Sequence, residues 1–380
     1  MRRSVSFSIA FVLFLFPLML GLVETTSPNP AVAPEGSFTN AAPAHFVRGP
    51  TVNLVTNSSA LIFWRTDVPM NATVDYGLEE LDLNLTASNS TVVGDHRITL
   101  TGLAIDSKYY YQVTSNGTAS DIYHFKTAPA DGAEFKMIVF GDNRPDTDTA
   151  PVQPQEYSDL VDLVIAEEPH IVIMTGDYVQ VVTESHSYNL DAWERFTNIT
   201  DRLGHYAPIY GVLGNHDTSA FTGTLRLEYL FDAFEMYDEP SPYSSFDYAG
   251  VHFTLLNSEE QYDNGRITGT QYDWLVDDLT NTSMSMKFVF AHQPLYPLQH
   301  IGSALDRNMT EMNRLQQLFE DKNVTLFATG HDHLFDRLTV NGVVHIIAGG
   351  GGAPLYSTPW GGAFHHYLKV NVSSGQVDFT

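Results

Sequence analysis

The sequence predicts a two-domain α+β protein, in which an N-terminal β-sandwich is followed by a larger domain of alternating strands and helices. Residues 46–128 contain short stretches where apolar and polar residues alternate, separated by Gly, Asn and Asp turns, which is typical of sandwich strands. From Phe135 onward, β-branched runs alternate with segments of helical periodicity, which indicates strand-helix-strand units around a mostly parallel sheet. Clusters of polar residues follow these runs, as they do at the ligand sites of open α/β sheets.

The N-terminal segment resembles an export signal. Met1-Arg2-Arg3 precedes an apolar stretch over residues 5–23, so we expect a signal peptide or anchor over residues 1–26. The stretch approaches the roughly 20 residues that span a bilayer, and no clear cleavage site follows it, which leaves an uncleaved anchor open. Residues 27–45 are polar and Pro-rich, as in a linker. We therefore expect a secreted or extracellular protein that touches a membrane only through such an anchor.

The composition narrows the chemistry. A hydrophobic content of 43% is sufficient for a large core, and the formal charge of −26 argues against a nucleic-acid partner. The absence of cysteine excludes disulfides and thiolate ligands, which leaves His, Asp and Asn for a hard or borderline metal. Ten Asn-x-Ser/Thr sequons fit a glycoprotein, although Ser/Thr-rich sequences also produce them by chance. They begin at Asn57, Asn71, Asn84, Asn89, Asn116, Asn198, Asn281, Asn308, Asn323 and Asn371.

For the first domain, residues 46–129, we expect seven strands. The clearest alternating stretches are Ala60–Trp64, Ala72–Tyr76, His96–Leu100 and Tyr109–Val113. The aromatic run Tyr109-Tyr110-Tyr111 has two interpretations, a ligand-binding patch or core packing. Alternation places Tyr109 and Tyr111 on one face of a strand, which favours packing.

For the second domain, five strands and three helices are predicted. The expected strands cover residues 135–140, 170–175, 207–213, 287–291 and 324–329, and the expected helices cover Glu156–Glu168, Leu190–Leu203 and Met312–Asp321. Each strand is followed by a polar cluster: Gly141-Asp142-Asn143, Gly176-Asp177, Gly214-Asn215-His216-Asp217, Ala291-His292 and Gly330-His331-Asp332-His333. One such cluster is usually a turn or a helix cap, but five in order predict a pair of metal ions. A pair needs a shared ligand, for which we choose Asp177.

These clusters resemble the motifs of the calcineurin-like metallophosphoesterases, and most of all those of the purple acid phosphatase branch. The stretches Val74–Gly77, Leu100–Leu103 and Tyr109–Tyr111 resemble the fibronectin type III-like N-terminal domain of that branch, and Ala348–Gly352 resembles a turn of its catalytic domain. The resemblance implies a four-layer α/β/β/α catalytic domain over residues 133–380. It also implies two divalent or mixed-valence ions of Fe, Zn or Mn.

The resemblance further implies a role for each residue. One ion would be held by Asp142, Asp177 and His333, and the other by Asp177, Asn215, His292 and His331. His216 would face the phosphate, oriented by Asp217, and would stabilise the transition state or protonate the leaving oxygen. A metal-bound hydroxide would attack phosphorus in line.

Two positions depart from the family pattern. Purple members carry a Tyr three residues after the bridging Asp, whereas this chain has Gln180 there and Tyr178 only one residue on, so we predict a colourless protein. Other branches place a His where this chain has Arg144, which cannot coordinate a cation. Gln180, Asn143 or water would have to complete the first ion's ligands. Arg144 would instead grip the phosphate in a bidentate way, or would be a solvated turn residue.

The remaining histidines are weaker candidates. His300 lies eight residues beyond His292, a spacing at which plant-type members place a substrate-facing His, so we assign it to substrate or to support of the ligands. His186, His252, His365 and His366 match no pattern and are expected to pack or to lie on the surface. We expect Asp332 to stabilise its loop.

The predicted function is an exported, dinuclear metal-dependent phosphoesterase, most simply an acid phosphatase-like phosphomonoesterase. A phosphodiesterase or nucleotidase on the same centre, a catalytically impaired phosphate-binding or adhesion protein, and a structural surface protein are the alternatives. Selectivity would lie in loops such as Gln180–Ser187 and Ser258–Gly269. The sequence gives no indication of natural substrate or oligomeric state.

Overall fold

The structure, a computed structural model, describes residues 45–181, 183, 185–218, 227–235, 241–259 and 265–380, and residues from 42 onward belong to one compact unit. The expected signal peptide and nearly all of the expected linker lie outside the described residues. Among the helices that are described, none combines the length and the apolar character needed to cross a bilayer.

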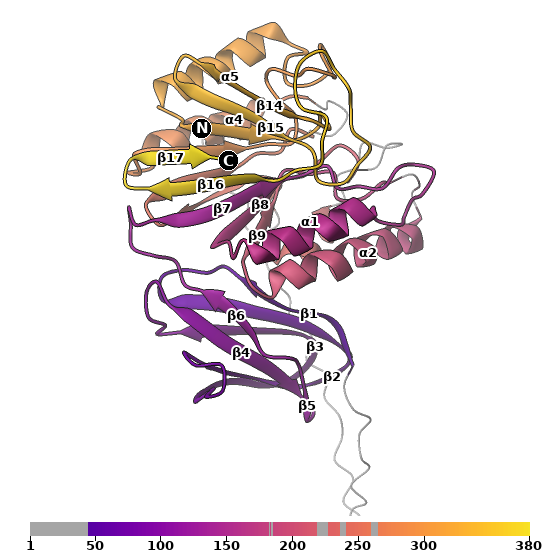
Figure 1. Ribbon diagram of the computed structural model, residues 1–380, viewed down its shortest axis with the longest axis vertical. Coiled ribbons are helices and arrows are strands. Elements are labelled where there is room, and N and C mark those ends of the chain that lie inside the picture. Colours follow the sequence, from indigo (N-terminus) through magenta and orange to yellow (C-terminus); the bar gives the residue numbers. More distant parts are fainter. Residues whose placement is uncertain (1–44, 182, 184, 219–226, 236–240, 260–264) are drawn as a thin grey trace, which may run out of the picture. The chain divides into compact units, whose positions relative to one another are not determined.

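The N-terminal domain is built from six strands that form one hydrogen-bonded network (Figure 1). They are β1 (Phe46–Asn53), β2 (Ser59–Gly77), β3 (Leu85–Thr101), β4 (Lys108–Ser115), β5 (Thr118–Ala119) and β6 (Tyr123–Lys126). The expected count of seven is wrong because the two strands predicted at 60–64 and 72–76 are one strand, β2. Register shifts between Arg65 and Met70 bend β2, so that its first half pairs with β1 and its second half with β4.

Alternation in β4 has the predicted consequence. Tyr109 and Tyr111 are buried in the sandwich core, whereas Tyr110 between them is half-buried. Their rings pack near Phe125 of β6, at centroid distances of 6.0 and 5.9 Å. Core packing, rather than a ligand-binding patch, therefore accounts for this aromatic run.

The second domain contains two sheets, each with a parallel centre and antiparallel strands at an edge. The first has the order β17-β16-β7-β8-β9, formed by β7 (Phe135–Phe140), β8 (Ile171–Met174), β9 (Ile209–Gly211), β16 (Leu368–Ser373) and β17 (Gln376–Phe379). The second has the order β10-β11-β12-β13-β15-β14, formed by β10 (Ser244–Tyr248), β11 (Val251–Leu255), β12 (Met286–Phe290), β13 (Leu326–Thr329), β14 (Phe335–Val340) and β15 (Val343–Ala348). The parallel strands are buried on both faces, which explains their continuous apolar runs.

Helices cover the outer face of each sheet. Helices α1 (Gln155–Ala166), α2 (His186–Gly204) and α3 (Leu227–Phe234) share a core with the first sheet, and α4 (Gly269–Asn281) and α5 (Met309–Asp321) share one with the second. A further core, which includes Met137, Phe253 and Phe288, lies between the two sheets. The expected four layers α/β/β/α are confirmed (Figure 1).

The layers bring the polar clusters together. Strands β7, β8 and β9 run parallel in one sheet, β12 and β13 run parallel in the other, and each of the five ends within four residues of a cluster. Contacts between residues of different clusters, described below, show that the carboxyl ends of the two sheets meet at one site. This is the sheet edge where α/β folds place ligands.

Candidate metal centre

The two aspartates at the centre have an unusual backbone conformation. Asp142 and Asp177, which follow β7 and β8, both have a φ of 57°, in the left-handed region that Asp tolerates better than most residues. The Asp142 N–H donates to the carbonyl of Gly176 at 2.9 Å, which ties the two turns together. A Cβ at Gly176 would lie 2.7 Å from His292 Nδ1, so only glycine allows this close approach.

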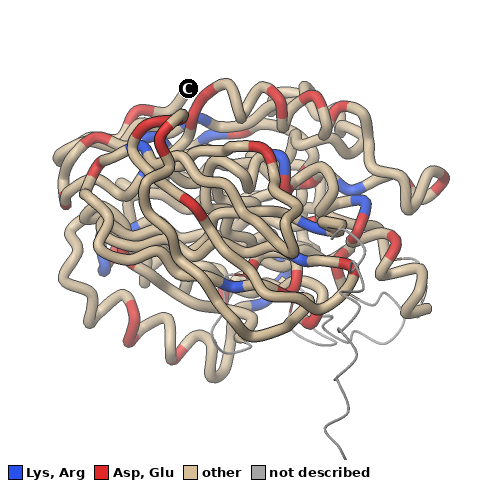
Figure 2. Tube along the Cα trace, turned by 90° about the horizontal axis from the view of Figure 1, so that it is seen from below, with Lys and Arg blue, Asp and Glu red and all other residues tan. Residues whose placement is uncertain are grey.

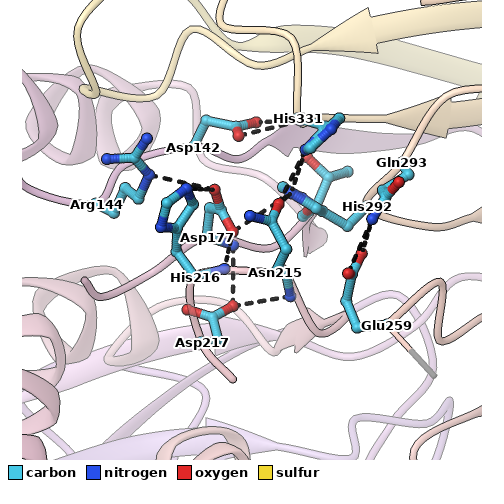
Figure 3. Close-up of polar contacts among 12 residues, drawn as sticks. Asp142, Arg144, Asp177, Asn215, His216, Asp217, Glu259, His292, Gln293 and His331 are labelled. Carbon is cyan, nitrogen blue, oxygen red and sulfur yellow. Dashed lines mark hydrogen bonds and ion pairs between the residues drawn. The ribbon is translucent and has the colours of Figure 1, made fainter. Parts of the chain in front are cut away.

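Four donor atoms from different strand ends form one candidate metal position (Figure 3). Asn215 Oδ1 lies 3.0 Å from His292 Nε2 and 2.9 Å from His331 Nδ1, and these two nitrogens are 3.3 Å apart. Asp177 Oδ1 lies 3.3 Å from His292 Nε2. The Nδ1 of His292 faces the Thr175 carbonyl at 2.8 Å, an arrangement that leaves the Nε2 lone pair for a metal.

A second position lies on the other side of Asp177. His333 Nε2 is 3.5 Å from Asp142 Oδ1, and its Nδ1 faces the Pro354 carbonyl at 2.7 Å, which again frees Nε2 for a metal. Asp142, Asp177 and His292 offer donor atoms that all lie within 4.8 Å of one another. Asp177 therefore borders both positions, as a bridging ligand must.

The electrostatics of these residues fit a bound cation. Burial lowers the pKa of His333 to about 4 and also lowers the pKa of His292 and of His331, so all three imidazoles are neutral at neutral pH. Burial and the nearby Asp177 raise the pKa of Asp142. Burial alone would raise the pKa of Asp177 too, but its interactions with His292, His216 and Arg144 together outweigh burial, and the pKa falls. Neutral imidazoles beside two buried carboxylates suit zinc, manganese or iron.

Arg144 is not a solvated turn residue, one of the two roles that its sequence left open. Its Nε lies 3.3 Å from Asp177 Oδ2, and its Nη1 donates to Gln180 Oε1 at 2.9 Å and to the Pro145 carbonyl at 3.2 Å. The residue is only 8% exposed. Gln180 therefore uses its amide oxygen to bind Arg144, and that oxygen is not free for a metal.

Tyr178 contributes no phenolate to the centre. Its hydroxyl lies 2.9 Å from the Met174 carbonyl and 2.6 Å from the Val212 carbonyl, and its ring packs within the core between the first sheet and its helices. A Cβ at Gly211 would lie 2.6 Å from this hydroxyl. The absence of colour remains a prediction, and the Tyr178 hydroxyl is engaged by carbonyls away from Asp177.

Asp217 does not orient His216, contrary to its expected role. Its carboxylate instead accepts the backbone N–H groups of Gly214, Asp177, Tyr178 and Val179, at 2.9, 2.9, 2.8 and 3.1 Å. The N–H of His216 donates to Asp177 Oδ1 at 2.9 Å, and its ring Nε2 is 4.0 Å from Asp177 Oδ2. Asp217 holds the loops that carry two ligands, whereas His216 presents its ring beside Asp177 (Figure 3).

His300 is brought to the centre, as its spacing suggested. Its ring centroid lies 4.1 Å from that of the ligand candidate His331. Asp332 Oδ1 is 2.6 Å from His300 Nδ1, and its carboxylate also accepts the N–H groups of Leu298 and Gln299. Asp332 thus does more than stabilise its own loop, because it fixes the position of His300.

Two residues of the site were missed from the sequence. The Tyr356 ring stacks on that of His333 at 4.3 Å and lies 5.4 Å from the His300 ring. Glu259 is fully buried and accepts hydrogen bonds from Gln293, the residue after a ligand candidate, and from Ser258; burial raises the pKa of Glu259 to about 8. The available signals were the Gly-rich turn before Tyr356 and the position of Glu259 soon after β11.

Four histidines that match no family pattern, His186, His252, His365 and His366, do not contact the candidate ligands. His186 Nδ1 lies 2.6 Å from the Tyr229 hydroxyl, and His252 lies between Asp247 and Asp278. His365 and His366 face backbone carbonyls of the last long loop and its neighbouring Gly-rich turn. Packing and surface roles remain the prediction for all four.

Comparison with known proteins gives two family matches. Residues 120–335, more than half of the chain, match the family described as calcineurin-like phosphoesterase. Residues 48–127 match the family described as the purple acid phosphatase N-terminal domain. The two matches overlap over residues 120–127, which include β6, the last strand of the sandwich.

Individual relatives are distant. Purple acid phosphatase 23 of Arabidopsis thaliana is 24% identical over 300 residues, which cover 68% of this chain and 62% of that protein. An uncharacterized protein of Mycobacterium tuberculosis is 23% identical over 354 residues, which cover 77% of this chain and 64% of that protein. The chain therefore spans less than two thirds of the length of either relative.

Solved structures share the fold. Purple acid phosphatase PPD1 from yellow lupin (Lupinus luteus) seeds aligns with a TM-score of 0.63 and 19% identity, over 88% of this chain and 71% of that chain. The structure of PhoD aligns with a TM-score of 0.68 and 11% identity, over 90% of each chain. These similarities confirm the two-domain α+β architecture.

Proposed function

The chain belongs to the calcineurin-like phosphoesterase family, and on that premise we propose that it hydrolyses phosphate esters at a dinuclear metal centre. The placement of Asp177 carries this proposal. Its Oδ1 lies 3.3 Å from His292 Nε2, and one of its oxygens lies within 4.8 Å of donor atoms of both Asp142 and His292. A carboxylate shared by two donor sets is what a metal pair requires.

The described residues divide between holding metal and handling substrate. Asp142, Asp177 and His333 would hold one ion, and Asp177, Asn215, His292 and His331 the other. When bound, such a pair supplies Lewis acidity toward the phosphate and lowers the pKa of water. His216, with a side chain 31% exposed beside Asp177, is placed to hydrogen-bond a phosphate oxygen or to pass a proton to the leaving oxygen.

The substrate side of the site is formed by His300, Tyr356 and Arg144. The His300 ring lies against His331 and the Tyr356 ring against His333, so a phosphate held near the ligands would have these rings beside it. Arg144 adds a buried positive charge, which supports its predicted grip on the phosphate. A phosphomonoester is the simplest substrate for this arrangement. The loop 258–269 that would select among esters lies partly outside the described residues.

Export and the domain division complete the proposal. Residues 1–26 would direct export as a signal peptide or anchor, 27–45 would link it to the folded part, 46–129 would support, and 133–380 would catalyse. The ten sequons fit this extracellular location.

A second candidate function, phosphate binding without turnover, is favoured by one observation. The Arg144 guanidinium lies against the carboxylate that should bridge the ions, where related enzymes are expected to carry a metal ligand. If this charge kept one ion out altogether, the centre would bind phosphate but not hydrolyse its esters.

Hydrolysis of p-nitrophenyl phosphate and its bis-ester, measured together with metal content, separates these functions. We expect turnover by the wild type and its loss in Asn215→Ala, because Asn215 Oδ1 contacts both imidazoles of one position. Asn313→Ala, on the exposed face of α5, is the matched control and should keep full activity. Equal turnover in the two variants, or none in the wild type with added Zn²⁺ or Mn²⁺, would contradict the proposed hydrolase.

A further inference from the structure

We propose that the two metal positions differ in their affinity for a metal ion because of the residues that form them. The position at Asn215, His292 and His331 retains its ion, whereas the position at Asp142 and His333 fills only when free metal is plentiful. This inference rests on the proposed function, because it concerns the same centre. It makes the free concentration of a divalent cation the regulator of the enzyme.

The first argument is the number of donors. The retaining position has four protein donors from four strand ends, linked by contacts of 2.9 to 3.3 Å. The other has three, contributed by Asp142, His333 and the shared Asp177. Zinc sites with four protein donors are closed, whereas sites with three protein donors leave the fourth position to water or substrate.

Gln180 does not supply the missing donor. Its Oε1 accepts a hydrogen bond from Arg144 at 2.9 Å, and because the Gln180 side chain is buried, a change of partner would leave Arg144 without that contact. Asn143 contacts the Tyr178 carbonyl through its Nδ2 at 3.4 Å, and its buried Oδ1 has no hydrogen-bond partner among the described residues. Water or Asn143 Oδ1 is left as the fourth ligand of this position.

The second argument is charge. Arg144 Nε lies 3.3 Å from Asp177 Oδ2, while His292 contacts the other oxygen, Oδ1. The guanidinium is a permanent cation, so it takes up part of the negative charge that the first ion would use and also repels that ion. Burial limits the screening of this repulsion by solvent.

Arg144 is also held in place. Its backbone N–H donates to the Asp177 carbonyl at 2.9 Å, and its side chain is fixed by Gln180 and by the carbonyl of Pro145. The Arg144 guanidinium therefore cannot move away from a bound metal ion unless several buried contacts break. A phosphate, which is negative, would offset the repulsion, so substrate and the weakly held ion should favour each other's binding.

The experiment is a zinc titration of the full chain. Protein stripped with a chelator is loaded with Zn²⁺, dialysed against metal-free buffer and analysed for zinc, and calorimetry gives both affinities. We expect one zinc ion per chain to remain, and a second to bind at least about tenfold more weakly. His292→Ala should lose the retained ion, whereas His333→Ala should keep it.

Substitution of Arg144 tests the cause. Arg144→His removes the cation and adds an imidazole, whereas Arg144→Met removes the cation alone. Both variants should reduce the difference in zinc affinity between the two metal positions, and Arg144→His should reduce it more. Arg195→His, an equal change of charge on the exposed face of α2, should leave this difference unchanged. Retention of two zinc ions by the wild type, or loss of the retained ion in His333→Ala but not in His292→Ala, would overturn the proposal.

The outcomes also separate this inference from the function on which it rests. Two tightly bound ions with turnover would leave the hydrolase intact and remove only the inequality. No bound zinc and no turnover under any added ion would reject the hydrolase itself. If neither Arg144 variant folds, as judged by circular dichroism, the comparison of His292→Ala with His333→Ala still decides.

Discussion

At the scale of single residues, Asp217 shows how one carboxylate can organise a metal centre without binding metal. It accepts four backbone N–H groups, three from the turn after β8 and one from the loop after β9. Those two segments carry Asp177, the proposed bridging ligand, and the ligand candidate Asn215. The carboxylate is fully buried, so any N–H group that it released would lose a strong acceptor without gaining water.

Asp217→Asn should therefore cost more than a typical loss of one hydrogen bond. An amide offers one oxygen and two donors, so at least one backbone N–H group would face an NH2 group, and we expect a loss of about 2–4 kcal/mol in the free energy of unfolding. Asp146→Asn, at an exposed turn, is the control and should change stability little. Urea unfolding measures both. A loss below about 1 kcal/mol in Asp217→Asn would contradict the loop-holding role.

The sequence predicted the candidate metal ligands but not the residues that hold those ligands in place. Asp142, Asn215 and His331 could be proposed as ligands because Asp, Asn and His are the available ligand types and each of the three follows a predicted strand. The role of Asp217 depends on how two turns approach each other, and that of Tyr356 depends on a loop folding back over His333. Neither arrangement follows from spacing along the chain.

His300 gives a prediction about substrate rather than metal. Its Nδ1 is held by Asp332 at 2.6 Å and its ring lies beside that of His331, so we expect its Nε2 to face substrate rather than an ion. We expect His300→Ala to lower kcat/KM by roughly tenfold or more, with the zinc content unchanged. His365→Ala, an exposed histidine of the last long loop, is the matched control. Loss of zinc in His300→Ala would instead make His300 a ligand.

At the scale of elements, periodicity predicted three of the helices in the described residues and missed α3 and α4. The predicted helices became α1, α2 and α5, whose apolar residues recur on one face. Helix α4 buries Leu275 and Leu279, but the surrounding polar residues hid that spacing. The fusion of two predicted strands into β2 was missed because a bend at a register shift looks like a turn in sequence.

One ionic cluster joins strands β10 and β11 of the second sheet to helix α4. His252 of β11 lies 2.6 Å from Asp247 Oδ1 of β10 and 3.0 Å from Asp278 Oδ2 of α4, so both ring nitrogens face carboxylates. Ser245 and Thr254 donate to the same Asp278. Burial would lower the pKa of His252, but the bonds to Asp278 and Asp247 outweigh burial and raise the pKa. The imidazolium form, which donates to both carboxylates, is the form the fold stabilises.

The direction of this pKa shift fixes how stability should depend on pH. Because the pKa of His252 is higher in the folded than in the unfolded chain, the stabilisation is complete below about pH 6.5 and is lost as pH rises through the folded value. His252→Gln should cost about 1–3 kcal/mol at pH 5.5 and clearly less at pH 9. Urea unfolding of both proteins at the two pH values measures the difference. A cost that does not fall with pH would mean that His252 is neutral in the fold.

At the scale of the whole molecule, negative charge dominates. The chain carries 45 acidic and 19 basic residues, and Figure 2 shows Asp and Glu on every side of the described trace, with fewer Lys and Arg. Repulsion among these carboxylates opposes the compact state. The basic residues are therefore important where they pair with several acidic groups, and one such cluster joins the sandwich to the helices of the α/β domain.

Arginines of the sandwich make that junction in two different environments. Arg48 of β1 donates to the carbonyls of Asp232 and Ala233 and lies 3.4 Å from Asp201 of α2, with only 6% of its side chain exposed. Arg97 of β3 pairs with Glu235 at 2.7 Å; the Arg97 side chain is 46% exposed, whereas that of Glu235 is 6% exposed. Because water reaches Arg97 but not Arg48, we expect the contact of Arg97 to be the weaker of the two.

Arg48→Ala should accordingly destabilise the protein far more than Arg97→Ala. Removal of Arg48 leaves two carbonyls and a carboxylate without their buried partner, for which we expect a loss of about 3–5 kcal/mol, against about 1–2 kcal/mol for Arg97, because in that pair only Glu235 is buried. In 1 M NaCl, compared with low salt, the Arg97 effect should shrink because the exposed guanidinium is screened, whereas the Arg48 effect should persist. The same salt should raise the melting temperature of the wild type by reducing repulsion among its carboxylates. Urea and thermal unfolding at both salt concentrations test all three expectations. Equal losses in the free energy of unfolding of the two variants would mean that the junction depends on net charge rather than on the buried contacts of Arg48.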